Sequence, residues 1–172
     1  MPPCKLCRFK NCCNWAFRSL YTKENGYYCP HFTEDTLKVI ISCSKSQIKT
    51  DIPVKITELY VSTIAKLKLK FARKKAQNDK NIFIISGTLG LIDLDYEALP
   101  YDSKLKLPSV KQVEDQIRFL NIEKDDKILY IGTKKYGKWL KDHFFYKLSY
   151  HPDLMNLKGS GHYIQKLKFL SD

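Results

Sequence analysis

The chain has 172 residues, which is long enough for one domain with a real core and a small appendage. A hydrophobic content of 44% with seven glycines and seven prolines excludes a disordered or low-complexity chain. The net charge of +12 favours a partner that carries phosphates, nucleic acid above all, and no apolar run approaches the roughly 18 to 20 residues of a membrane span. The N-terminus lacks the apolar stretch of a signal peptide, so we expect a reducing cytoplasm.

The first part of the chain, residues 1–33, is predicted to be a cysteine-rich metal-binding module. Cys4 and Cys7 have the Cys-x-x-Cys spacing of a metal knuckle, and Cys29 closes the loop from a distance. The fourth ligand of a tetrahedral zinc site would come from one of three further residues: Cys12, Cys13 or His31. The same thiolates suit an iron-sulfur cluster, and small buried cysteines are the alternative without metal. We expect structural zinc, because about thirty residues bury too little surface to fold alone.

Residues 34–172 are predicted to form an α/β domain. Continuous apolar runs predict strands at 38–43, 82–87, 127–132 and, as a weaker pattern, 145–150. Helical patterns lie between and after them, at 57–77, 109–120, 134–143 and 161–170. This alternation predicts a mostly parallel sheet of three to four strands with helices on both faces. The lysine-rich stretch 66–75 is interpreted as a solvated helix face over a buried one.

Polar residues follow three of these strands, in the stretches SCSKS (42–46), SGTLG (86–90) and IGTKKYG (131–137). Because ligands of open parallel sheets bind beyond the carboxyl ends of the strands, one shared pocket is predicted there. Its expected groups are backbone amides, ammonium groups and carboxylates, supplied by Gly87, Gly90, Lys45, Lys134, Asp93, Asp95 and Asp102. A ligand with a phosphate, a sugar and a flat base suits this mixture. The alternative is that each segment is an ordinary polar turn.

The order of motifs also carries a resemblance. The stretches ISCSKSQIKTDIPVKITELYVST, FIISGTLGLIDLDYEALPYDSKL and LKGSGHYIQKLKFL resemble an uncharacterised bacterial and phage domain family over about residues 38 to 171. That family looks related to the peroxide-stress YaaA proteins, which bind DNA, and more distantly to uracil-DNA-glycosylase-like domains. The motif positions that the resemblance transfers are Ser44, Lys45, Glu58, Tyr60, Ser62, Ser86, Gly87, Gly90, Tyr101, Asp102, Gly159 and Gly161. Thr88 and Leu89 depart from the Lys-Tyr pair of many relatives, which puts catalysis in question. Glu58 and Tyr60 have a structural alternative, as a first-turn acid and a packing aromatic.

Two functions follow as expectations, both with DNA preferred to RNA as the partner. The first is a base-processing enzyme of DNA-glycosylase type, in which a carboxylate assists cleavage of the glycosidic bond. Asp102 is the first candidate for that carboxylate and Asp95 the second, while Tyr101 or Tyr136 offers an aromatic face to a flipped base. His162 is a further candidate, because the two glycines that precede it would let a helix N-terminus approach a ligand phosphate.

The second expected function is DNA binding without catalysis. A metal-stabilised interaction protein is a third possibility. No Gly-x-Ser-x-Gly nucleophile motif, Walker phosphate loop or dinucleotide fingerprint is present.

Overall fold

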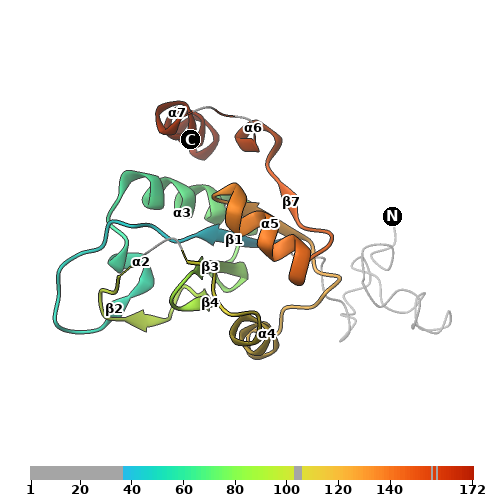
Figure 1. Ribbon diagram of the computed structural model, residues 1–172. Coiled ribbons are helices and arrows are strands. Elements are labelled where there is room, and N and C mark those ends of the chain that lie inside the picture. The colour runs from blue at the N-terminus through green and yellow to red at the C-terminus, as the bar shows by residue number, and fades with distance from the viewer. Residues whose placement is uncertain (1–36, 103–105, 156, 158) are drawn as a thin grey trace, which may run out of the picture. The chain divides into compact units, whose positions relative to one another are not determined.

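The computed structural model describes residues 37–102, 106–155, 157 and 159–172 (Figure 1). One folded unit spans Leu37–Asp172. The predicted metal module of residues 1–33 lies outside the described residues. None of the described helices has the length and apolar composition that a membrane span requires.

A five-stranded sheet forms the centre of the unit, with the strand order β4-β3-β1-β6-β7. Its strands are β1 (Lys38–Ser42), β3 (Ile82–Ser86), β4 (Gly90–Asp93), β6 (Ile128–Ile131) and β7 (Ser149–Tyr150). All neighbours pair in parallel except β3 and β4. Two short strands, β2 (Val54–Lys55) and β5 (Glu97–Ala98), pair separately. The prediction of a mixed α/β unit with a mostly parallel sheet is confirmed.

The prediction of three to four strands was too low, because β4 is a fifth strand. The chain turns back after β3 through residues 87–89, and Ser86 then pairs with Gly90. The glycine has a φ of +75°, a conformation that favours glycine and permits this tight reversal. A strand of four residues that begins at a turn glycine has the local sequence pattern of a loop. Near the other edge, only two residues of the predicted 145–150 strand pair in the sheet.

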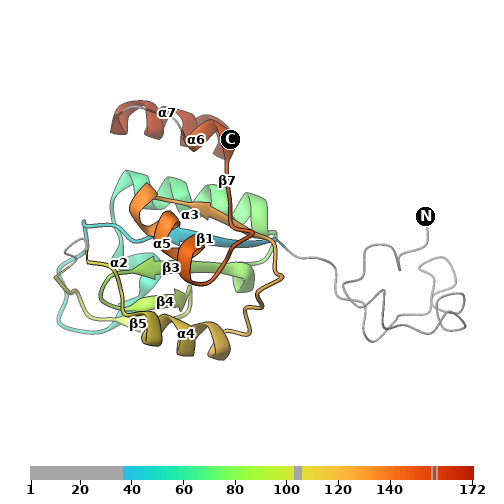
Figure 2. The same ribbon diagram turned by 45° about the vertical axis from the view of Figure 1, so that its right-hand side comes forward.

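The central residues of β1, β3 and β6 are apolar because both faces of the sheet are covered. In β1, Val39 and Ile41 belong to one core, and Ile40 belongs to the other. The first core contains residues of α3 (Thr63–Ala76) and of α7 (Ser160–Ser171). The second contains residues of α4 (Val110–Phe119) and of α5 (Lys134–His143). In both ribbon views α7 lies beyond α3, on the side away from the sheet (Figures 1 and 2).

The helix predicted at 57–77 is divided in two. A short α2 (Ile56–Leu59) ends where Tyr60 becomes extended, and α3 begins after Ser62. The Oγ atom of Ser62 accepts a hydrogen bond of 3.1 Å from the backbone N–H of Ala65, which caps the new helix. The remaining short elements are a 3₁₀ turn at Asp79–Asn81 and α6 at Pro152–Met155.

The connections that leave the strands diverge at the carboxyl ends of the parallel strands. The carboxyl ends of β3, β1, β6 and β7 lie at one edge of the sheet, since these strands are parallel neighbours. The chain that leaves β1 continues to α2 and α3 on one face, whereas the chain that leaves β6 continues to α5 on the other. Such divergence leaves a crevice outside the strand ends, where ligands of open α/β sheets bind.

Candidate functional site

A network of three side-chain hydroxyl groups lies at the carboxyl ends of β1 and β3. The hydroxyl of Tyr101 is 2.9 Å from the Oγ atom of Ser86 and also forms a hydrogen bond with the hydroxyl of Tyr60. Tyr60 is buried and follows α2, while Tyr101 is half-buried and follows β5. Three of the residues predicted from sequence are thus brought together, although 41 positions separate the two tyrosines.

Both tyrosines of this network stay protonated at neutral pH. Burial raises the pKa of the Tyr60 hydroxyl well above its ordinary value, and the nearby Tyr101 adds to that rise. Burial likewise raises the pKa of the Tyr101 hydroxyl, although the hydrogen bonds with Ser86 and Tyr60 oppose the change. The network therefore presents neutral hydroxyl groups, each able to donate or accept a hydrogen bond.

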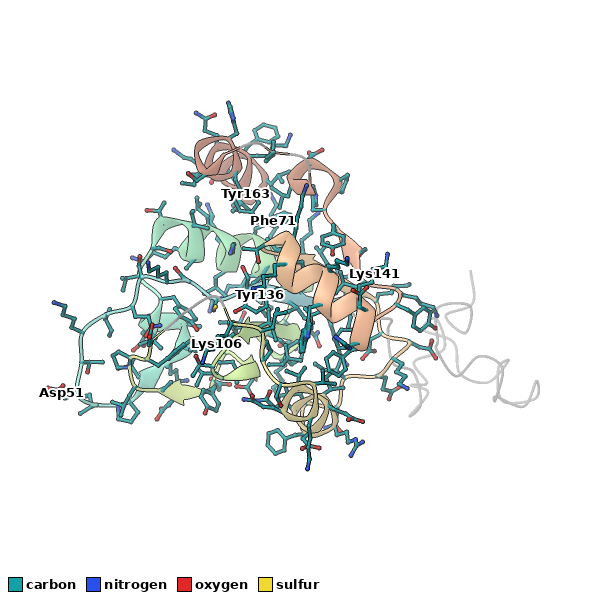
Figure 3. All side chains as sticks on the ribbon, in the orientation of Figure 1. Asp51, Phe71, Lys106, Tyr136, Lys141 and Tyr163 are labelled. Carbon is teal, nitrogen blue, oxygen red and sulfur yellow. The ribbon has the colours of Figure 1, made fainter. Side chains whose placement is uncertain are left out.

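Gly87 lies directly after the network and has neighbours too close for a side chain. A Cβ atom there would be 2.2 Å from the backbone oxygen of Lys106 and 2.9 Å from the hydroxyl of Tyr136. That hydroxyl donates a hydrogen bond of 2.8 Å to the same Lys106 oxygen, and Figure 3 labels both residues. Burial raises the pKa of Tyr136, with the thiol of Cys43 as a further contributor. The predicted aromatic candidate Tyr136 therefore stands beside Gly87 and Cys43.

Two glutamines of α4 hold the turn between β3 and β4. Gln116 accepts a hydrogen bond of 2.8 Å from the backbone N–H of Leu91 and donates one of 2.8 Å to the backbone oxygen of Leu89. Gln112 donates to the backbone oxygen of Thr88 at 3.4 Å. Sequence reasoning missed this pair, although glutamines four positions apart lie on the same side of a helix. These bonds fix the turn that contains Thr88 and Leu89, the two residues that depart from the pattern of the resembling family.

Ser44 joins the end of β1 to the start of α3. Its Oγ atom is 2.7 Å from the Oγ atom of Ser62, the residue that caps α3. Backbone bonds from Ile48 to Leu59 and from Val61 to Ser46 fasten the same loop to the end of α2. The neighbouring candidates Lys45 and Glu58 are exposed, so they lie at the surface around the site. Ser44 is a positioning residue in this arrangement.

The structure separates the two carboxylate candidates. Asp102 is exposed and adjoins the network through Tyr101, and its backbone oxygen accepts a hydrogen bond of 3.4 Å from the Oγ1 atom of Thr88. Asp95 lies beyond the amino-terminal end of β3, away from the network, because β4 runs antiparallel to β3 and Asp93 pairs with Phe83. There Lys55 donates a hydrogen bond of 2.9 Å to Asp95, which lowers the pKa of this exposed carboxyl. The shared pocket predicted from sequence therefore contains neither Asp93 nor Asp95.

Two remaining candidates lie elsewhere in the unit. His162 is exposed in the first turn of α7, and five elements, α4, β6, α5, β7 and α6, separate it from Tyr101 of the hydroxyl network along the chain. Gly90 serves the β3–β4 turn, where a Cβ atom would be 2.0 Å from the Oε1 atom of Gln116. Its role is therefore to shape the turn.

A buried lysine behind the site was missed by sequence reasoning. The Nζ atom of Lys68 donates a hydrogen bond of 2.6 Å to the Oγ atom of Ser42, at the end of β1, and both residues are buried. Burial lowers the pKa of Lys68 to about 8. The sequence indicates this burial only through spacing, because Lys68 precedes Phe71 by three positions and Ala72 by four and so lies on the buried face of α3. Lys68 thus holds the side chain of Ser42, the last residue of β1.

The predicted metal ligands Cys4, Cys7, Cys12, Cys13, Cys29 and His31 all lie outside the described residues. Within the described ranges, no group of three or more His, Cys, Asp or Glu side chains is placed to hold a metal ion. No curated protein and no solved structure gives a significant match to this chain. A family model described as a family of unknown function matches residues 39–169, which include every residue of the hydroxyl network. The chain belongs to this family, DUF6884.

Proposed function

We propose that this protein binds nucleic acid and takes one base into the crevice at the carboxyl edge of the sheet, as a base-processing enzyme of DNA-glycosylase type. The observation that carries the proposal is the hydroxyl network of Tyr60, Tyr101 and Ser86, set beside Gly87 at the strand ends. Neutral hydroxyls both donate and accept hydrogen bonds, which suits the mixed edge of a nucleobase. The absence of a side chain at Gly87 lets the backbone of Lys106 and the hydroxyl of Tyr136 pack directly beside the network.

The charge of the chain supports a nucleic-acid partner. The formal charge of +12 produces a field that attracts phosphates, and binding of this kind weakens as salt rises because counterions are released. Lys45 and Lys134 are exposed after β1 and β6, so they offer ammonium groups near the same edge. The resemblance to YaaA-like DNA-binding proteins and to glycosylase-like domains favours DNA as the nucleic acid.

Asp102 supplies the chemistry in this proposal. Its carboxylate accepts a proton from a water molecule as the water oxygen attacks C1′ of the sugar. The bond between C1′ and the base nitrogen breaks, and the departing base takes a proton from solvent. The tyrosine hydroxyls hold the base by hydrogen bonds during this step. The products are an abasic site and a free base, so the atoms balance without a cofactor.

A panel of DNA duplexes and single strands with normal and modified bases tests the proposal. Strand cleavage in alkali after incubation reports abasic sites. The wild type should form abasic sites on at least one base, Asp102→Asn should lose this activity while retaining DNA binding, and Asp95→Asn should retain both. Equal activity of the wild type and Asp102→Asn would remove Asp102 from the chemistry. RNA strands of the same sequence measure the preference for DNA.

DNA binding without catalysis is the second candidate function. The exposure of Asp102 favours it, because a catalytic carboxylate is commonly enclosed, where burial and neighbouring groups tune its pKa. The Thr88–Leu89 departure from the resembling family points the same way. Salt-dependent binding to every strand, with no abasic product on any base, would select this function over the enzyme.

A further inference from the structure

A cavity of about 290 Å³ lies between the carboxyl ends of β6 and β7. Lys134 and Lys138 of α5 line it, together with Tyr150 and His151 at the end of β7 and Tyr163 of α7. We call it the β6–β7 cavity. It is distinct from the hydroxyl network, because that network lies at the ends of β1 and β3 and the strand order places β6 and β7 beyond β1.

Two buried polar atoms of the cavity residues have no hydrogen-bond partner among the described residues. They are the Nδ1 atom of His151 and the hydroxyl of Tyr163. Buried polar atoms are nearly always hydrogen-bonded in native proteins, so two on the lining of one cavity indicate a polar ligand. Figure 3 shows Tyr163 on the side of α7 that faces α3 and α5. Both residues line the cavity, and their side chains must rotate for these covered atoms to reach a molecule seated there.

The protonation of these two groups suits hydrogen bonding to a neutral heterocycle. Burial lowers the pKa of His151, with Lys75 and Lys166 acting in the same direction and Asp153 opposing them. The imidazole is therefore neutral at pH 7, with one nitrogen that donates and one that accepts. Burial raises the pKa of Tyr163 to about 12, so its hydroxyl keeps its proton.

One wall of the cavity is positively charged. Lys134 and Lys138 are four positions apart on α5, and neither forms an ion pair within the described part of the chain. The side chain of Thr133 does not cap α5, so the first backbone N–H groups of this ten-residue helix lack that partner. Together with the two ammonium groups, the helix N-terminus favours a phosphate at this wall.

The other walls are flat and apolar. Tyr150 and Tyr163 present aromatic rings, and Leu154 of α6 adds an aliphatic side chain. The volume is near the lower end of the range of about 300 to 1,000 Å³ for small-molecule pockets, so the cavity suits one nucleoside and not a dinucleotide cofactor. An aromatic lining, two hydrogen-bonding atoms and a cationic wall match the three parts of a nucleotide.

We propose that the β6–β7 cavity binds a nucleoside 5′-monophosphate. The heterocycle lies between the tyrosine rings and bonds to His151 and Tyr163, and the phosphate contacts Lys134 and Lys138. Either a free mononucleotide or the 5′-terminal nucleotide of a strand presents this chemistry. The inference shares Lys134 with the proposed nucleic-acid binding but uses none of the residues of the hydroxyl network, so variants of that network test the two proposals separately.

Isothermal titration of the full chain with AMP, GMP, CMP and UMP at pH 7.5 tests the inference. At least one of the four should bind saturably at a ratio near one, and its unphosphorylated nucleoside should bind about tenfold or more weakly. The double variant Lys134→Ala/Lys138→Ala should lower the affinity about tenfold or more, and Tyr163→Phe about threefold to tenfold. Lys141→Ala is the matched control, since this exposed residue on α5 does not line the cavity (Figure 3).

A second titration, with a 5′-phosphorylated oligonucleotide, separates the two sources of the nucleotide. In one outcome the oligonucleotide is the only probe of the two that binds, with its affinity lowered in Tyr163→Phe and in the lysine double variant as expected for a mononucleotide. That result supports the cavity as a binding site and identifies the 5′ end of a strand as its ligand. Absence of binding by both probes overturns the inference, as does binding that these variants leave unchanged. Asp102→Asn should not alter mononucleotide affinity, so loss of abasic-site formation and loss of cavity binding are separable results.

Discussion

Replacement of Lys68 by methionine should stabilise the protein in a pH-dependent way. Lys68 is 6% exposed, and its described hydrogen bonds go to the Oγ and backbone oxygen atoms of Ser42. A buried ammonium without a carboxylate partner costs free energy, which is why burial lowers its pKa from 10.5 to about 8. Methionine has a similar length and no charge, so Lys68→Met removes this cost.

The expected magnitude follows from the two pKa values of Lys68. A pKa difference of about 2.5 corresponds to about 3 kcal/mol. Below about pH 8, Lys68 is charged in both the folded and the unfolded chain, so the wild type bears the full free-energy cost of burying the ammonium group. Between about pH 8 and pH 10.5 the unfolded chain binds more protons than the folded one, so the stability of the wild type rises with pH. Lys68→Met lacks this rise, and it also loses one hydrogen bond worth about 1 kcal/mol.

Urea unfolding followed by circular dichroism measures the effect. At pH 7 the free energy of unfolding of Lys68→Met should exceed that of the wild type by about 2 kcal/mol, and this gap should shrink by about 2 kcal/mol at about pH 9.5. Titration of the buried tyrosines affects both proteins alike and cancels in the gap. Lys74→Met, at an exposed position of α3, should show no such change. A gap that stays constant between the two pH values would refute a lowered pKa at Lys68.

Three further predictions concern the turn, the hydroxyl network and the metal module. Gly90→Ala should lower the melting temperature, because φ is +75° and the new Cβ atom would meet Gln116 at 2.0 Å, whereas Gly161→Ala, with no atom within 4 Å, should not lower it. Tyr101→Phe should reduce the free energy of unfolding by about 1 to 2 kcal/mol in urea, since two hydroxyls lose their shared partner; an unchanged value would contradict the network. Elemental analysis should find about one zinc ion per chain and less in Cys29→Ser; neither zinc nor iron in the wild type would refute the metal module.

The amino-acid sequence by itself determined the strands and helices whose residues are apolar in a local pattern. The runs at 38–43, 82–87 and 127–132 became β1, β3 and β6 because strands covered on both faces need continuous apolar side chains. The helix predicted at 134–143 has the same bounds in the structure. The pattern of strands and helices also implied the parallel sheet, and with it the edge where Ser86 and Gly87 lie.

Only the tertiary structure decided which polar residues meet at that edge. Tyr60 and Tyr101 touch because the loop after β5 returns to the end of α2, a contact that no local period contains. The reversal at Gly90 carries Asp95 beyond the amino-terminal end of β3, although it follows β3 closely in sequence. Lys68 is buried because α3 turns that position toward the end of β1. Long-range contacts of this kind depend on how elements pack and on where the chain turns, so local composition and periodicity do not specify them.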